Sequence, residues 1–141
     1  MVEGQEYGYS DTFGIVRTRR VNQPPDLEVS TTTEAYPEFV ELIIKWAKQE
    51  FGIMKNFPFT TFTINGGEKT TMHRDSHNAG ASCIIGLGNY EQGQMLLWDQ
   101  DDGEQSLDEL SQFQPELVDI KNKAILFDGR RTHVTEEFAG T

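Results

Sequence analysis

The sequence predicts a mainly β fold with one covering helix, a β-sandwich or jelly roll within a single domain over residues 1–141. Two observations lead to this fold class. Short runs rich in β-branched and aromatic residues recur along the chain between glycine, asparagine and aspartate turn signals. One longer run with helical periodicity precedes most of them. A chain of 141 residues can bury a hydrophobic core without disulfides.

We predict that residues 1–56 form a lead-in followed by the helix. Residues 1–14 show no sustained period, which indicates an irregular or edge-strand entry. We expect a short strand at 14–19. Residues 22–26 should form a loop, because two prolines remove backbone donors there. The helix is expected from a cap near Thr33, with Pro37 in its first turn, to Phe51, with Gly52 as its stop. Its apolar face should pack on a sheet.

We predict that residues 57–141 form the β core. We expect strands at 57–65, 82–88, 94–99, 116–120, 123–127 and 132–138, with 82–88 and 94–99 forming a hairpin. Residues 106–113 fit either a short helix or an irregular connection. The acidic run Asp99–Gln105 lacks the spacing of an EF-hand and is predicted to be a solvated loop.

A metal site is predicted around His73 and Asp75. In an extended segment, residues i and i+2 point to the same face, so this imidazole and this carboxylate can converge on one ion. His133, which opens a β-branched run, is the best third ligand. Two histidines and one carboxylate form a facial triad with open coordination positions, which suits iron(II) and oxygen chemistry better than a closed structural zinc site.

Charge and composition limit the partners and the compartment. The net charge of −11 makes nonspecific nucleic-acid binding by this chain alone unfavourable. The N-terminus has no export signal, and no apolar run approaches the roughly 20 residues of a membrane span. The single cysteine, Cys83, is expected to be a buried thiol in a strand, which fits a reducing compartment, cytoplasmic or nuclear.

Three motifs carry a family resemblance. Gly67–Asp75, the glycine- and tyrosine-containing run from Gly88 to Asp99, and Phe127-Asp-Gly-x-x-x-His133 resemble the core of the iron(II)/2-oxoglutarate dioxygenases over roughly residues 57–141. The pattern His-Arg-Asp-x-x-Asn, ending at Asn78, is similar to the TET/JBP-like branch, which oxidises methyl groups of nucleobases, and more distantly to the AlkB branch.

The resemblance implies a cupin-like double-stranded β-helix with iron(II) held by His73, Asp75 and His133. Its members use 2-oxoglutarate and O2 to hydroxylate a C–H bond. The resemblance therefore implies these two co-substrates, and it implies a modified nucleobase as one class of substrate. It also implies an arginine about nine or ten residues after the distal histidine, which pairs with the remote carboxylate of 2-oxoglutarate.

That arginine would lie beyond Thr141. We therefore expect either a piece of a longer protein that lacks its last strand, or a short form that binds the co-substrate poorly. Arg130 and Arg131 are the alternatives to this arginine, although their position before His133 puts them on the approach loop, and Arg131 is the candidate of the two. His77 is expected at the pocket rim, with a ligand role as the alternative.

Asn78 is expected to support the ligands or the backbone through hydrogen bonds. Two other functions remain open at this stage. One is a non-catalytic metal-binding or scaffold domain on the same fold. The other is a cupin-type metal enzyme that uses no 2-oxoglutarate.

Overall fold

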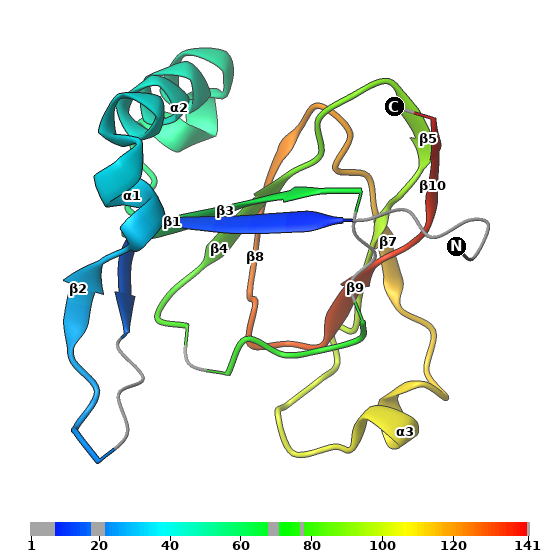
Figure 1. Cartoon of the computed structure of the whole chain (residues 1–141). Helices are drawn as coiled ribbons and strands as arrows, with labels where there is room; N and C mark the ends of the chain where they lie inside the picture. The colour runs from blue at the N-terminus through cyan, green and yellow to red at the C-terminus, as the bar shows by residue number, and fades with distance from the viewer. Residues whose placement is uncertain (1–7, 18–21, 68–70, 77, 141) are drawn as a thin grey trace, which may run out of the picture. The chain divides into compact units, whose positions relative to one another are not determined.

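The computed structural model describes residues 8–17, 22–67, 71–76 and 78–140. These residues fall into two compact units, Met1–Glu68 and Lys69–Thr141, here called the N-terminal and C-terminal units and described separately. The described residues are mainly β, all strand pairs are antiparallel, and three α-helices are present among them (Figure 1). The predicted mainly β class is therefore confirmed.

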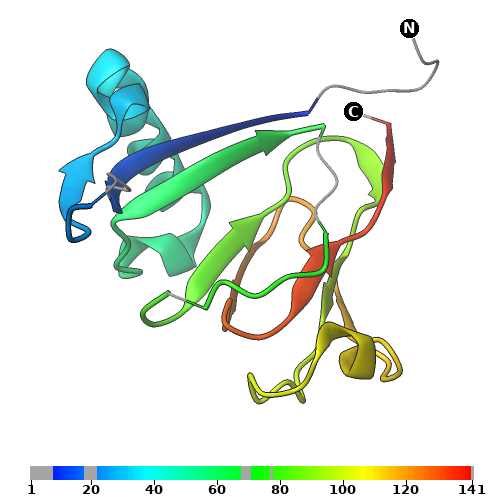
Figure 2. The ribbon, with the colours of Figure 1, turned by 60° about the horizontal axis from the view of Figure 1, so that its bottom comes forward.

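The N-terminal unit contains a sheet in the order β2-β1-β3, made of β1 (Tyr9–Arg17), β2 (Leu27–Val29) and β3 (Thr61–Gly66). Figure 2 shows β1 beside β3, and their register runs from Tyr9 opposite Gly66 to Gly14 opposite Thr61. Of the two alternatives for residues 1–14, an irregular or an edge-strand entry, the described part from Tyr9 on is a strand, and its partner over Tyr9–Gly14 is β3, which lies far away in sequence. Sequence periodicity within 1–14 does not reveal that partner.

The predicted single helix is two helices, α1 (Thr31–Ala35) and α2 (Pro37–Glu50). The cap is Ser30, whose side chain accepts from the Thr33 backbone N–H at 3.2 Å, and not Thr33. The break falls at Tyr36, with φ −133° and ψ 57°. Proline disfavours the α conformation of the residue before it, so Pro37 starts α2 and ends α1.

Helix α2 ends at Glu50 and is followed by the 3-10 helix η1 (Gly52–Lys55). Its Phe39 ring lies 5.4 Å from the ring of Phe13 in β1, and Phe13 stacks on Phe62 of β3 at 5.1 Å. Phe13 is buried. This aromatic cluster confirms that one face of the helix packs on a sheet.

The described residues of the C-terminal unit form three small sheets. Strand β4 (Ser82–Ile85) pairs with β8 (Ala124–Phe127), and β5 (Tyr90–Gln92) pairs with β10 (Phe138–Gly140). Strand β6 (Met95–Leu97) lies between β7 (Glu116–Val118) and β9 (His133–Thr135). The predicted strands are present, most of them shorter than expected.

The predicted hairpin of 82–88 with 94–99 was wrong. Strand β6 instead occupies the centre of a sheet, with its Met95 fully buried and its Leu97 nearly so. A short apolar strand is stabilised by partners on both edges, and sequence proximity does not choose those partners.

Two connections complete the C-terminal unit. Helix α3 (Leu107–Leu110) follows a capping box between Ser106 and Glu109, which decides for a short helix over an irregular connection. The turn at Gly129 and Arg130 leads from β8 in one sheet to β9 in another. Among the described residues, no helix has the length and apolar character needed to cross a membrane.

Candidate metal centre

The structure brings His73, Asp75 and His133 together. One ligand atom from each residue lies within 4.8 Å of the other two. His73 Nε2 is 3.8 Å from Asp75 Oδ1, and His133 Nε2 is 3.4 Å from Asp75 Oδ2. The carboxylate therefore faces both imidazoles, and the three donor atoms can point at one ion.

Backbone pairing holds the two ligand-bearing segments side by side. His73 and His133 exchange backbone hydrogen bonds of 3.1 and 3.0 Å, and the Asp75 N–H donates to the Gly129 carbonyl at 2.8 Å. The segment 71–76 thus runs antiparallel to the chain entering β9. The strand that precedes this segment, β3, pairs with β1, and the described partner of the His73 segment is the β9 entry.

Both histidines present the same ring nitrogen to the site. His73 Nδ1 is bonded to the Thr71 carbonyl, and His133 Nδ1 to the Arg131 carbonyl at 2.7 Å. A carbonyl only accepts, so each Nδ1 carries the proton and each neutral ring has a free lone pair on Nε2. Metal-binding histidines commonly use this arrangement, in which the second nitrogen fixes the ring orientation.

The electrostatics of the triad favour a cation. Without a metal, His133 in its protonated form donates from Nε2 to Asp75, and this hydrogen bond lowers the pKa of Asp75, against burial, while the charges of protonated His133 and His73 add to the effect. Burial acts to lower the pKa of His133, but hydrogen bonds to Asp75 and to the Arg131 carbonyl, with the attraction to Asp75, give a net rise. The Asp75 carboxylate thus stays ionised beside the imidazoles and attracts positive charge.

A glycine leaves room for the carboxylate. A Cβ on Gly129 would lie 2.8 Å from Ser82 Oγ, 3.3 Å from Asp75 Oδ2 and 3.3 Å from Asn78 Nδ2. Asn78 donates its side-chain N–H to Ser82 Oγ at 3.1 Å and its backbone N–H to the Asp75 carbonyl at 3.2 Å. Asn78 is thus hydrogen-bonded to the backbone of a triad residue, whereas His77 lies outside the described residues.

The acidic run contains a residue that sequence reasoning placed wrongly. Asp101 is buried, not solvated, and its carboxylate is bonded by Arg74 and by Thr132. Arg74 and Thr132 are the neighbours of His73 and His133 in sequence. The sequence contained a signal for this contact. In an extended segment, the residue between two metal ligands points to the opposite face, so Arg74 needs a partner of its own.

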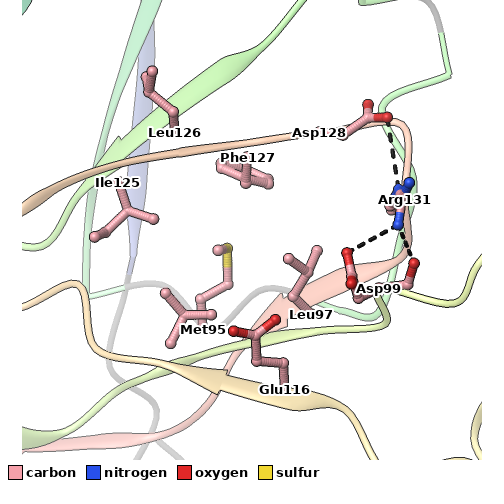
Figure 3. A pocket seen from close by; sticks show the side chains of 10 residues that line it. Met95, Leu97, Asp99, Glu116, Ile125, Leu126, Phe127, Asp128 and Arg131 are labelled. Atoms are coloured by element: carbon pink, nitrogen blue, oxygen red, sulfur yellow. Dashed lines mark hydrogen bonds and ion pairs between the residues drawn. The ribbon is translucent and has the colours of Figure 1, made fainter. Parts of the chain in front are cut away.

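A cavity of about 330 Å³ lies among strands β6, β7 and β8 of the C-terminal unit. Figure 3 shows Ile125 and Phe127 of β8 directed toward Met95 and Leu97 of β6. The Phe127 ring is 5.0 Å from the His133 ring, so the cavity wall reaches the triad. Its size is within the range of small-molecule sites.

Arg131 at this cavity and its neighbour Arg130 are both engaged with acids. Arg131 lines the cavity, donates through Nη1 to the carbonyl of Asp99 and to its carboxylate at 2.9 Å, and has Nε 3.8 Å from Asp128 (Figure 3). Arg130 pairs with Asp128 at 3.1 Å. A co-substrate carboxylate at Arg131 would compete with these partners.

No match was found among known protein families, curated proteins or solved structures. The interpretation of the site therefore rests on the geometry of its residues. Two imidazole nitrogens and one carboxylate oxygen fit iron(II), and the same donors also accept zinc, nickel or manganese. Within the described residues, the group includes no fourth protein ligand that would close the coordination sphere.

Proposed function

We propose that the C-terminal unit is the core of an iron(II)- and 2-oxoglutarate-dependent dioxygenase. The observation that carries the proposal is the convergence of His73, Asp75 and His133, with both Nε2 atoms facing the carboxylate. The overall reaction converts a substrate C–H, 2-oxoglutarate and O2 into the C–OH product, succinate and CO2. Bound iron(II) would supply oxygen activation and two-electron oxidation.

The residues of the chain supply geometry and a restricted environment. The Thr71 and Arg131 carbonyls fix the ring tautomers, and the buried His133 keeps one side of the site dry. Phe127 adds an apolar wall beside His133. The cavity is lined by β8 from one sheet and by β6 and β7 from another, which supports a double-stranded β-helix, or jelly roll, as the proposed architecture.

Co-substrate binding needs a cation for the remote carboxylate of 2-oxoglutarate. The resemblance implies an arginine about nine or ten residues after the distal histidine for this role. Within the cavity, Arg131 is the alternative, and it would have to exchange Asp99 for the co-substrate.

This pairing favours a second candidate function, a metal-binding domain without 2-oxoglutarate turnover. The cavity presents Asp99, Glu116 and Asp128 together with the single guanidinium of Arg131. Such a lining disfavours a dianion. Oxygen chemistry independent of 2-oxoglutarate, as in cupin-type enzymes, would be compatible with the same lining.

For the substrate, we propose a nucleobase methyl or other C–H group, as the resemblance implies. The net charge of −11 opposes unaided binding to a duplex, so the first substrates to test are free modified nucleosides and short single strands.

The test is anaerobic calorimetric titration with iron(II), with and without 2-oxoglutarate, on the wild type, His73→Ala and His77→Ala. The proposal expects tight binding by the wild type and His77→Ala, loss in His73→Ala, and stronger binding with 2-oxoglutarate. Iron- and 2-oxoglutarate-dependent succinate formation would then establish turnover. Metal binding without a 2-oxoglutarate effect or succinate would favour the second candidate, and equal titrations of wild type and His73→Ala would refute the metal site.

A further inference from the structure

Behind the triad lies a buried carboxylate that contacts both ligand-bearing segments. Asp101 accepts from Arg74 at 2.6 Å on each oxygen, Nε to Oδ2 and Nη2 to Oδ1. Arg74 stands between His73 and Asp75. Its fork therefore ties the segment that carries two of the ligands to the segment that follows β6.

The same carboxylate holds the residue before the third ligand. Asp101 Oδ2 accepts from the backbone N–H of Thr132 at 2.8 Å and from its hydroxyl at 2.6 Å. The Thr132 carbonyl accepts from the Trp98 N–H at 2.9 Å, and Thr132 is fully buried. Thr132 thus has its polar groups fixed by Trp98 and Asp101.

Arg74 has a further anchor, and Asp101 closes its own loop. Arg74 Nη2 also donates to the Gln105 carbonyl at 2.7 Å, while Asp101 Oδ1 accepts from the Gly103 N–H at 2.8 Å. The acidic loop is therefore folded around this ion pair. We call Arg74, Asp101 and Thr132 the clamp.

The clamp is more deeply buried than two of the three ligands, His73 and Asp75. The Asp101 side chain is 0% exposed and that of Arg74 19%, whereas the His73 and Asp75 side chains are 38% and 42% exposed. Packing alone does not fix half-exposed side chains. A buried ion pair contributes little net stability relative to apolar residues of similar volume, but it demands one geometry.

We propose that Asp101, with Arg74 and Thr132, is a positioning residue that sets the separation and orientation of the two ligand segments for metal binding. The proposal rests on the metal site of the proposed function. None of the clamp residues contacts the metal in this proposal. They act through their sequence neighbours His73, Asp75 and His133.

The mildest test changes one hydroxyl. Thr132→Val keeps the size and the backbone N–H but loses the bond to Asp101, and Thr132→Ser keeps the hydroxyl as the matched control. The readouts are calorimetric affinity for cobalt(II) and the visible spectrum of the cobalt(II) complex, which reports ligand number and geometry. We expect Thr132→Val to lose about 10- to 100-fold in affinity with an altered spectrum, and Thr132→Ser to resemble the wild type.

A second variant separates positioning from stability. Arg74→Met combined with Asp101→Leu replaces the ion pair with apolar side chains, an exchange that is often neutral or stabilising. We expect this double variant to retain a cooperative unfolding transition and to lose metal affinity and the wild-type cobalt spectrum.

The outcomes are distinguishable. A wild type that binds no cobalt(II) refutes the proposed metal site itself. A wild type that binds, together with a folded Thr132→Val or folded double variant that has wild-type affinity and spectrum, refutes the clamp alone. Weakened binding and a changed spectrum in Thr132→Val, with Thr132→Ser unchanged, support it even where the double variant fails to fold.

Discussion

Arg74 donates through Nε and Nη2 to the two carboxylate oxygens of Asp101, at 2.6 Å for each contact, and the Asp101 side chain is fully shielded from solvent. The two residues come from segments separated along the chain by strands β4, β5 and β6. Removing one partner of such a pair leaves an uncompensated buried charge, which costs far more than the pair itself contributes.

Asp101→Asn should therefore be strongly destabilising. Loss of the charge leaves Arg74 without its counter-ion, and we expect a decrease of about 3–5 kcal/mol in the free energy of unfolding at neutral pH. Denaturant unfolding in the presence of a chelator measures it without a metal contribution. Asp119→Asn is the control, because its pair with Lys123 is exposed and should matter little. Equal midpoints for both variants would contradict the role given to Asp101.

Asp101 should also determine how the free energy of unfolding changes at low pH. The hydrogen bond from Arg74 holds the pKa of Asp101 well below its ordinary value, against burial, with Thr132 and Gly103 contributing. A carboxylate with a lowered pKa in the folded state stabilises the folded protein fully at pH values above its unfolded pKa of about 3.9. This stabilisation is lost as the pH falls from the unfolded pKa through the folded one. The stability difference between wild type and Asp101→Asn should thus be constant from pH 5 to 7 and shrink below about pH 4. A difference that does not shrink in acid would show that ionisation of Asp101 is not its source.

Gly129→Ala should weaken metal binding. The added methyl would lie 2.8 Å from Ser82 Oγ and 3.3 Å from Asp75 Oδ2, so the carboxylate must shift. We expect a loss of about 10- to 100-fold in cobalt(II) affinity, typical of disturbed support around a ligand. Adding Ser82→Ala removes the closest atom and should restore part of the affinity, while Gly52→Ala, which meets nothing within 4 Å, serves as the control. Wild-type affinity in Gly129→Ala would mean that the carboxylate has room to spare.

Cys83 should be a slowly reacting thiol. It lies in β4 and is half-buried, where we had expected full burial, and desolvation raises its pKa, against a backbone hydrogen bond from Ile125. A raised pKa means less thiolate at neutral pH, and thiolate is the reactive form. Reaction with an aromatic disulfide reagent at pH 7.5 should be much slower in the native protein than in denaturant. Similar rates in both conditions would refute this expectation.

The local features of the fold were largely readable from the sequence, and the pairing was not. The capping box of Ser106 and Glu109, the strand at Glu116–Val118 and the turn at Gly129 follow from short-range chemistry. The partners of β6 and the strand character of Tyr9 depend on chain segments far away in sequence. The break at Tyr36 was missed, although Pro37 restricts this residue and is a local signal for it.

The candidate site shows the same division. Alternation along the chain placed His73 and Asp75 on one face, and the triad that the structure assembles consists of the three residues chosen from the sequence. Asp101 was missed because its acidic neighbours made it look solvated. Alternation indicates that Arg74 needs a partner, but only the tertiary structure shows that this partner is the buried Asp101 and not the exposed Asp102 beside it.

The exchange of backbone hydrogen bonds between His73 and His133 has a thermodynamic consequence. His133 joins His73 and Asp75 only in the folded chain, so an ion at this site would bind the native state much more tightly than the unfolded one. By mass action, free metal at 100 times its dissociation constant would add about 2.7 kcal/mol to the free energy of unfolding. Metal supply would then govern the folded population, and with it resistance to proteolysis, as directly as it governs chemistry.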